Sequence, residues 1–593
     1  MNILHLLSQN HLTGAEVYAV TLAHHQLVQG HNVYHLSNGF HYPSKAIKLE
    51  FEVETKSKIT FIKNILWLRN FINKQNIQVI HTHSRAAAKL AYWAILFTKT
   101  AQVSTVHGVQ HPSFSKKLHN QYGKFIIAVC ENIKNHLIFD FAYNKNQIKI
   151  IRNPINSTDY YFLKNERPLN KTLKIAIVGR TTGPKKQRTE QVLNALKNTP
   201  AEISIIGGNL SDLNIDVEYK SQIKELNNIT LNTSVYSQFD LIIGSGRVCI
   251  ESMISGVITI AFGEAQYVGL ITKSNFFDAI KSNFGDIHPE SKDPVINLSQ
   301  FINDIQTEFN EHHSLSVLAQ NEFSLDLIAN KILRLYESAC FLKNYSSWIP
   351  VLMYHKIPDH EINSKHKIFV TKYNFEKHLK FFKNCGFKTL TFSDLQKYRT
   401  GQKPFSEFPK KPLILTFDDG YTDNLSNASP LLKKYQFNAQ LFLLADSKIK
   451  QNNWDLSASE PTHDIVSGLE RQRWKDSQFE IGSHGFSHKK ITELSSEEAL
   501  TELTESKKHL ENEFGIPINT YAFTYGITNE AAADLAQKAG YDYAVNTDTG
   551  GLLIEEDPYR IFRVNIFPDE SCLSLFKKTS KWYRKYYYLK RKR

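Results

Sequence analysis

The sequence contains no hydrophobic run that approaches the roughly 18–20 apolar residues of a membrane-spanning helix. Its N-terminus lacks a basic region ahead of the short apolar stretch, so we expect no secretory signal. The five cysteines are scattered and none has C-x-x-C spacing, which argues against a disulfide framework or a cysteine zinc site and fits a reducing compartment. These absences predict a cytoplasmic protein.

Acidic residues are missing from the C-terminal segment 577–593, which carries nine Lys or Arg. This basic tail, with Trp and Tyr among the cations, accounts for much of the net charge of +13. It suits either a peripheral contact with an anionic membrane, at the inner face of the cytoplasmic membrane, or a solvated terminus. No recognition motif for nucleic acid accompanies it, so we expect no nucleic-acid partner.

Low-complexity sequence is lacking too, and 593 residues suggest about three or four globular domains. Short apolar runs that end in polar residues, such as "NIQVIHTH" and "FDLIIGSG", alternate with amphipathic segments. This pattern is typical of βαβ units and parallel sheets, an α/β fold. We expect two Rossmann-like domains at 1–165 and 166–342, a third α/β domain at 348–576, and the tail at 577–593.

Three features of the first half suggest a phosphate-bearing ligand. Gly14 lies in a loop before a predicted helix, where backbone can approach an anion. Arg180 and Lys185 follow a strand and suit a diphosphate. Glu251 lies near a predicted helix start, where it could accept hydrogen bonds from ribose hydroxyls. Taken singly, each feature is better explained by a structural role, such as a turn or the helix dipole, than by a ligand.

In this order and spacing, the features resemble glycosyltransferase family four, which has the GT-B fold. The resemblance implies that Gly14, Arg180, Lys185 and Glu251 bind a nucleotide-sugar donor. It also implies that His107 in "STVHG" is a catalytic residue near the transferred sugar. It further implies that transfer retains the anomeric configuration and that the transferase half needs no metal. His81 and His83 would shape the side of the site that receives the glycan or lipid-linked acceptor.

The sequence departs from that family at two positions. Ile243 stands where many members have a first Glu, and Lys186 follows the phosphate lysine where Gly is usual.

The stretch "LTFDDG" places Asp418 and Asp419 directly after an apolar run. Adjacent aspartates here could simply cap a turn or a helix. However, "GSHGFSH" supplies His484 and His488 after another apolar run, and a spacing of four puts both imidazoles on one face of a helical turn. We therefore predict a metal site of Asp419, His484 and His488, with zinc favoured by the N/O ligands and Asp418 left as the general base.

These motifs resemble the polysaccharide deacetylase (NodB-like) domain of carbohydrate esterase family four. "PVLMYHKI", "YAFTYG" and "DPYRIFRVNI" extend the resemblance over about 348–575. It implies a distorted, incomplete (β/α) barrel and substrate contacts from His355, Tyr525 and Arg563. Thr524 stands where Pro is usual, and the late strand lacks the histidine that serves as general acid in many members.

Our hypothesis from the sequence is a bifunctional enzyme of bacterial surface glycan biosynthesis, for lipopolysaccharide, capsule or exopolysaccharide. One part transfers a sugar from a nucleotide donor, and the other removes N-acetyl groups with a divalent metal. Two alternatives stay open: an inactive deacetylase domain that only binds glycan, or an inactive transferase half that docks the deacetylase.

Overall fold

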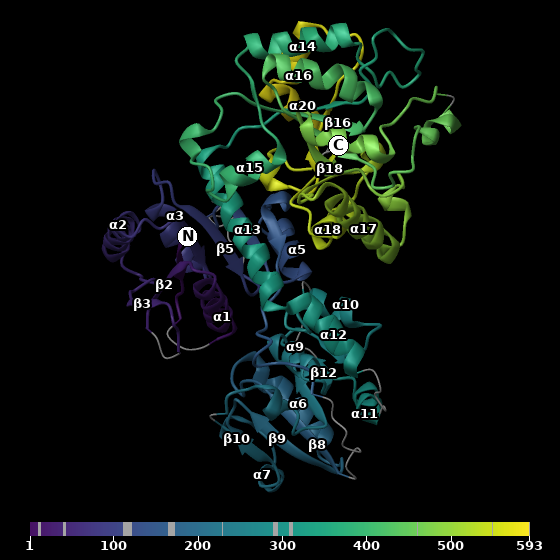
Figure 1. Ribbon diagram of the computed structural model, residues 1–593. Coiled ribbons are helices and arrows are strands. Elements are labelled where there is room, and N and C mark those ends of the chain that lie inside the picture. The colour runs from purple at the N-terminus through teal and green to yellow at the C-terminus, as the bar shows by residue number, and fades with distance from the viewer. Residues whose placement is uncertain are drawn as a thin grey trace. The chain divides into compact units, whose positions relative to one another are not determined.

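The computed structural model describes residues 1–9, 13–39, 43–110, 121–163, 172–227, 229–288, 295–306, 312–458, 460–547 and 550–591. The chain forms two compact units, Met1–Cys340 and Phe341–Arg593 (Figure 1). The boundary expected at residue 165 lies outside the described residues. The second unit begins at Phe341, ahead of the expected position 348. The Phe341 ring packs on Phe405 and Phe408 of that unit, with ring centroids 5.4 and 5.5 Å apart.

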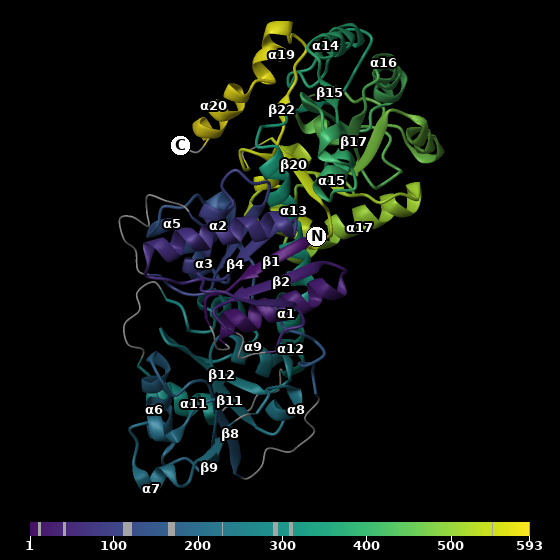
Figure 2. The same cartoon turned by 90° about the vertical axis from the view of Figure 1, so that its left-hand side faces the viewer.

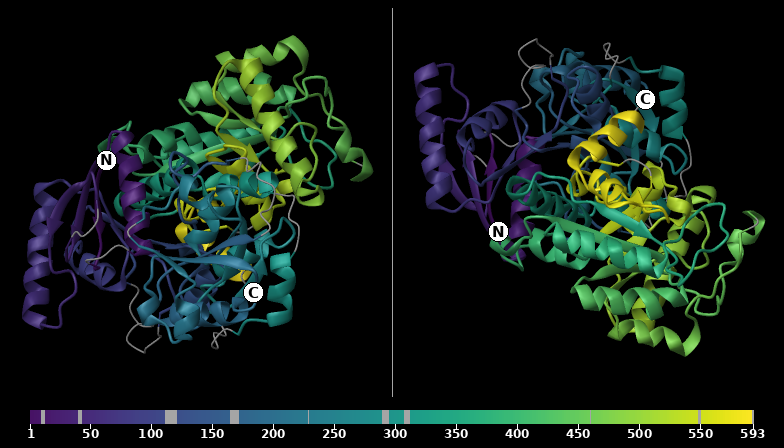
Figure 3. Two further views of the ribbon diagram at one scale, coloured as in Figure 1. Left: turned by 90° about the horizontal axis from the view of Figure 1, so that it is seen from below. Right: turned by 90° about the horizontal axis from the view of Figure 1, so that it is seen from above.

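The first sheet of unit one is entirely parallel, in the order β3-β2-β1-β4-β5-β6-β7. Its inner strands are largely buried because helices cover both faces, α2 and α3 on one and α1 on the other, whereas the edge strand β3 is mostly exposed (Figure 3). The elements are β1 (Asn2–Leu6), α1 (Gly14–Val28), β2 (Asn32–Ser37), β3 (Ile47–Glu50), α2 (Lys58–Lys74), β4 (Val79–Thr82), α3 (Arg85–Ala94), β5 (Ala101–Val106), β6 (Phe125–Ala128), α5 (Glu131–Phe139) and β7 (Ile148–Ile150).

The second sheet of unit one has the order β10-β9-β8-β11-β12-β13, with only the edge strand β13 antiparallel to its neighbour. The two sheets together confirm the predicted pair of Rossmann-like domains. The elements are β8 (Leu173–Val178), α6 (Pro184–Leu196), β9 (Ala201–Ile206), α7 (Val217–Lys220), β10 (Lys224–Leu226), α8 (Thr233–Tyr236), β11 (Leu241–Gly244), α9 (Arg247–Ile254), β12 (Ile258–Phe262), β13 (Tyr267–Leu270), α10 (Phe276–Ala279), α11 (Leu298–Gln306), α12 (His312–Phe323) and α13 (Leu325–Asn344).

Unit two is built on a nine-stranded parallel sheet in the order β21-β20-β19-β18-β17-β16-β14-β22, with β15 beside β16. Its helices alternate with the strands. The elements are β14 (Val351–Tyr354), α14 (Lys372–Asn384), β15 (Lys388–Thr389), α15 (Phe392–Arg399), β16 (Pro412–Asp419), α16 (Ser429–Tyr435), β17 (Ala439–Leu443), β18 (Phe479–Ser483), α17 (Ser496–Phe514), β19 (Thr520–Ala522), α18 (Glu530–Lys538), β20 (Tyr543–Asn546), β21 (Ile561–Phe562), β22 (Val564–Asn565), α19 (Cys572–Lys578) and α20 (Lys581–Arg591).

The two ends of this sheet are formed by a single stretch of chain. Ile561 in β21 pairs with Val545 of β20, and Val564 in β22 pairs with Leu352 of β14 at the other end. Arg563 is the one residue between the two strands. The sheet is therefore nearly closed, which confirms the predicted distorted (β/α) barrel.

The basic tail is helical and partly packed over its described residues. Figure 2 shows α19 and α20 following β22 at the yellow end of the chain. Tyr583, Arg584 and Tyr588 are buried, and the Arg584 guanidinium lies 4.6 Å from the ring centre of Phe562. Residues 577–591 are therefore not a frayed end, although Lys577, Trp582 and Lys585 among them are exposed to solvent. No helix among the described residues is both long and apolar enough to span a bilayer.

Candidate active sites

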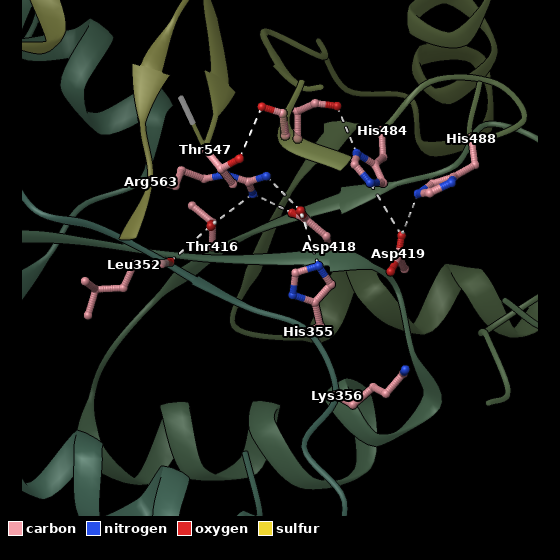
Figure 4. A network of polar contacts seen from close by, with 12 residues as sticks. Leu352, His355, Lys356, Thr416, Asp418, Asp419, His484, His488, Thr547 and Arg563 are labelled. Carbon is pink, nitrogen blue, oxygen red and sulfur yellow. Dashed lines mark hydrogen bonds and ion pairs between the residues drawn. The ribbon is translucent and has the colours of Figure 1, made fainter. Parts of the chain in front are cut away.

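Strand β16 brings two adjacent carboxylates to its C-terminal end and points them in different directions. Successive side chains of a strand lie on opposite faces, and Asp419 has a left-handed backbone with φ of 73°. Gly420, with φ of 81°, continues the turn. As a result Asp418 faces Arg563, whereas Asp419 faces the two histidines (Figure 4).

His484 and His488 reach Asp419 from a loop after β18, not from a helical turn as their spacing predicted. Gly485 and His488 have φ of 89° and 63°, values that end any helical path. The loop still converges: Nε2 of His484 and Nε2 of His488 lie 3.4 and 3.6 Å from Oδ1 of Asp419. Parallel strands end at one edge of the sheet, which explains why motifs distant in sequence meet here.

These three residues form a group that could hold a metal ion. Nδ1 of His484 donates to the carbonyl of Ala522 at 2.8 Å, so its Nε2 presents a lone pair toward Asp419. Among the described residues, the buried Oδ1 of Asp419 has no hydrogen-bond partner. Burial raises the pKa of Asp419 to about 6 and lowers that of His488. A cation would satisfy this unpartnered oxygen and the two lone pairs, so the residues fit the expected metal.

Asp418 is held as an anion by a buried guanidinium. Arg563 NH1 and NH2 donate to its two carboxylate oxygens at 2.6 and 2.8 Å, and neither side chain is more than 4% exposed. Burial alone would raise the pKa of Asp418, but Arg563 and the nearby imidazoles hold it well below its ordinary value. Nε2 of His355 lies 3.8 Å from Oδ2 of Asp418.

Arg563 therefore differs from its expected role as a substrate contact. Its guanidinium is fully buried and engaged with Asp418, because the closing strand carries it inward at the seam of the sheet. The separation of 145 residues between the two partners gave no sign of this pairing.

In unit one, the two predicted phosphate-binding cations lie near the same carboxylate. Arg180, beyond β8, is largely exposed, and its NH2 lies 3.8 Å from Oε1 of Glu264. Nζ of Lys185, at the start of α6, lies 4.0 Å from that oxygen and 3.5 Å from Oδ2 of Asp286. It also donates to Oγ of Ser245 at 3.1 Å. Glu264 and Asp286 escaped the sequence reasoning because both lie beyond β12 and belong to no recognised motif.

Glu251 departs from the expected geometry. It lies in the second turn of α9 and is 3% exposed. Arg247 Nε donates to its Oε1 at 2.5 Å, and the Tyr236 hydroxyl donates to its Oε2 at 2.8 Å. Each of these oxygens has one donor and keeps a second lone pair, so a ribose hydroxyl could be accepted without loss of either bond.

The remaining predicted residues of unit one lie at the C-terminal edge of the first sheet. Gly14 is the first residue of α1, after the N-cap Thr13, and open space surrounds the position of a Cβ there. His107 follows β5 and is partly exposed, with its Nε2 3.4 Å from Nδ1 of His83. The structure thus joins His107 to the predicted acceptor-side histidine.

Comparison with known proteins decides the family. The polysaccharide deacetylase family model matches residues 406–544. A Bacillus subtilis protein that carries the name polysaccharide deacetylase is 30% identical over 223 residues. The match covers 38% of this chain and 73% of that protein. The chain belongs to the polysaccharide deacetylase family. The poly-β-1,6-N-acetyl-D-glucosamine N-deacetylase of Staphylococcus aureus is 26% identical over 209 residues, 34% of this chain and 68% of that protein.

The deacetylase domain is fused to a transferase domain, since the Glycosyltransferase Family 4 model matches residues 12–159. A crystal structure of a glycosyltransferase from Rickettsia africae aligns with a TM-score of 0.46 and 19% identity, covering 57% of this chain and 98% of that one. Both families are families of enzymes.

In the deacetylase domain, aromatic side chains lie beside the histidines. The Trp454 ring stacks on His488 with centroids 4.1 Å apart, and Tyr525, 46% exposed, lies 4.8 Å from the same imidazole. Thr524, in place of the usual Pro, donates to the carbonyl of Lys489 at 2.7 Å and ties the Tyr525 turn to the histidine loop. Sequence reasoning missed Trp454, whose only signal was a lone Trp in a polar loop.

Proposed function

We propose that this chain is a bifunctional enzyme of surface glycan biosynthesis, which transfers a sugar from a nucleotide donor and removes N-acetyl groups from an amino sugar. The observation that carries the proposal is the Asp419, His484 and His488 group around an unpartnered carboxylate oxygen, directly beside the Asp418–Arg563 ion pair. One group fits a metal, and the other contains a carboxylate held in its ionised form.

A divalent ion, for which zinc suits the N/O ligands, would supply Lewis acidity at this site. Asp418 takes a proton from the attacking water, whose oxygen forms the new C–O bond to the acetyl carbon. Arg563 keeps Asp418 anionic and fixes its orientation. We propose that His355, at 3.8 Å from Asp418, passes the proton to the leaving amine as the C–N bond breaks. The products are acetate and a free amino sugar.

Trp454 and Tyr525 offer apolar surfaces to a sugar ring beside the metal group. This supports a glycan substrate, and equally a domain that only binds glycan. The late strand lacks the histidine that serves as the general acid in many related deacetylases. Catalysis is therefore the point that an experiment must decide.

The decisive experiment measures metal content and acetate release from N-acetylglucosamine oligomers. Asp419→Ala should lose metal and activity together. Asp418→Asn should keep its metal yet lose about 10²–10⁴-fold in rate, the usual weight of a general base. Asp476→Asn, an exposed aspartate of the same unit, is the matched control. A wild-type protein that binds oligomers without releasing acetate would support the glycan-binding alternative.

For the transferase half, the proposal rests on the convergence of Arg180 and Lys185 near Glu264. A diphosphate would compete with that carboxylate for both cations. Transfer from radiolabelled nucleotide-sugars to a glycan or lipid-linked acceptor tests it, and loss of transfer in Lys185→Ala with unchanged acetate release would support it.

We further propose that α19 and α20 contact an anionic membrane surface at the inner face of the cytoplasmic membrane. Both helices expose large apolar side chains among exposed lysines. The apolar residues are Leu573, Phe576, Trp582, Tyr586 and Leu589, and the lysines are Lys577, Lys581, Lys585 and Lys590.

Flotation with phosphatidylserine vesicles tests this contact. Deletion of the tail would also remove the packed Arg584 and Tyr588, so point changes are preferable. Trp582→Ser with Leu589→Ser should abolish flotation and leave acetate release from soluble oligomers unchanged. Leu469→Ser, which changes an exposed leucine elsewhere in the same unit, is the control. Equal flotation of all variants would reject the proposal.

A further inference from the structure

Unit one buries an unusual group of histidines beneath its predicted transfer site. His5 in β1 and His81 in β4 are cross-strand partners in register, and His83 follows β4. These three imidazoles are at most 5% exposed and offer nitrogen atoms within 4.8 Å of one another. They could hold a metal or form a hydrogen-bonded chain, and the contacts of their ring nitrogens distinguish the two.

Every ring nitrogen of these three histidines has a hydrogen-bond partner. Nε2 of His5 contacts Oε1 of Gln26 at 2.9 Å, and its Nδ1 contacts Nε2 of His83 at 3.0 Å. His81 contacts the Tyr336 hydroxyl through Nδ1 and Oγ1 of Thr105 through Nε2, both at 2.6 Å. By contrast, the metal group of unit two has an unpartnered carboxylate oxygen. The contacts in unit one therefore favour a hydrogen-bonded chain.

The amide of Gln26 gives this chain a direction. Its Oε1 can only accept, so His5 carries its proton on Nε2 and its Nδ1 accepts from His83 Nε2–H. Nδ1 of His83 then accepts from Nε2–H of His107 at 3.4 Å. On the other side, Nε2 of Gln26 donates to the Tyr336 hydroxyl at 3.4 Å.

The direction of donation is consistent through seven groups. The Tyr336 hydroxyl donates to Nδ1 of His81, and Nε2–H of His81 donates to Oγ1 of Thr105. In order of donation the seven groups are His107, His83, His5, Gln26, Tyr336, His81 and Thr105.

We propose that His83, His5 and Gln26 are positioning residues, which hold His107 in the Nε2–H tautomer and leave its Nδ1 lone pair as an acceptor for a sugar hydroxyl. This inference rests on the proposed sugar transfer. Burial lowers the pKa values of His5 and His107 to about 4, and burial with neighbouring imidazoles lowers that of His83. Each ring is thus neutral at pH 7, with one N–H and one lone pair, as a directed chain requires.

The kinetic test replaces His83, which accepts the hydrogen bond from His107. His83→Leu removes it and should lower kcat for sugar transfer about 10- to 100-fold, with KM for the nucleotide-sugar unchanged within about twofold. His83→Asn places an amide oxygen near the position of Nδ1 and should recover most of kcat. His35→Leu is the control: His35 is equally buried and its ring lies 5.3 Å from His5, but its Nδ1 contacts Ser44. Equal losses in all three variants would mean a merely structural role and overturn the proposal.

The tautomer can be read directly in the full chain labelled with ¹⁵N-histidine. Two-bond ¹H–¹⁵N spectra should give His5 and His107 as Nε2–H tautomers, and Gln26→Leu should shift both. A His107 resonance of the Nδ1–H form would overturn the proposal. This readout needs no turnover. A wild-type protein without transfer activity would refute the proposed transferase, and the spectra would still test the chain of hydrogen bonds.

Metal binding is the competing outcome. In an Asp419→Ala background, which removes the metal group of unit two, elemental analysis of the full chain should find no stoichiometric transition metal. One equivalent of metal that disappears with His81→Leu would identify a metal site in place of the hydrogen-bonded chain.

Discussion

Breaking the ion pair at the seam of the deacetylase sheet should destabilise unit two strongly. Arg563→Met keeps much of the side-chain volume but leaves Asp418 as a buried carboxylate without its two charge-assisted bonds of 2.6 and 2.8 Å. Removal of one partner from such a pair typically costs about 3–5 kcal/mol, because the other charge stays desolvated. For a domain of this size, that corresponds to a drop in Tm of roughly 6–20 °C.

The double variant separates pairing from packing. Asp418→Asn alone leaves a buried guanidinium unpaired and should cost a similar amount. Asp418→Asn with Arg563→Met contains neither charge, so its loss should be well below the sum of the two single losses. Scanning calorimetry of the full-length variants, with the unit-two transition identified by its response to chelator, measures all three. Additive losses would refute the argument that the two charges stabilise each other.

Three further predictions concern the metal group, the donor site and the aromatic surface. Since burial raises the pKa of Asp419 to about 6 in the metal-free protein, protonation stabilises that fold at low pH and the effect is lost as pH rises through 6. Metal needs the carboxylate, so metal affinity measured by titration should fall about tenfold per pH unit below 6, and a flat profile would contradict this. Lys185→Ala should weaken nucleotide-sugar binding, measured by calorimetry, about tenfold or more. Lys186→Ala should not, because Nζ of Lys186 lies 3.9 Å from Oε1 of Glu190 instead. Trp454→Ala should raise KM for oligosaccharides about three- to tenfold and leave metal content unchanged; loss of metal would show that it only supports the histidine loop.

The fold and the meeting of the deacetylase motifs could be read from the sequence. Apolar runs with polar ends predict parallel strands, and parallel strands end at one edge, so the aspartates and histidines had to approach each other. The local path could not be read, because a spacing of four suits a helix or a loop. The left-handed Gly485 and His488 decide for the loop.

Pairings between distant polar residues were also beyond the sequence. Arg563 reaches Asp418 only because the closing strand turns it inward, and motif spacing carries no information on that turn. Glu251 was expected to face a ligand, but Tyr236 and Arg247 bind both of its oxygens. A hydroxyl 15 residues away becomes a neighbour only through the packing of α8 on α9.

The seam also joins two parts of the deacetylase domain that lie far apart in the sequence. Leu352 pairs with Val564, so the contact that closes the sheet joins residues more than 200 positions apart. Contacts of such long range carry a loop-closure entropy cost and are associated with slow folding. Until β22 docks on β14, Asp418 lies at the end of a strand without its guanidinium. A chain in which β22 has not docked on β14 would therefore keep the other strand pairings of the sheet but lack the Asp418–Arg563 ion pair.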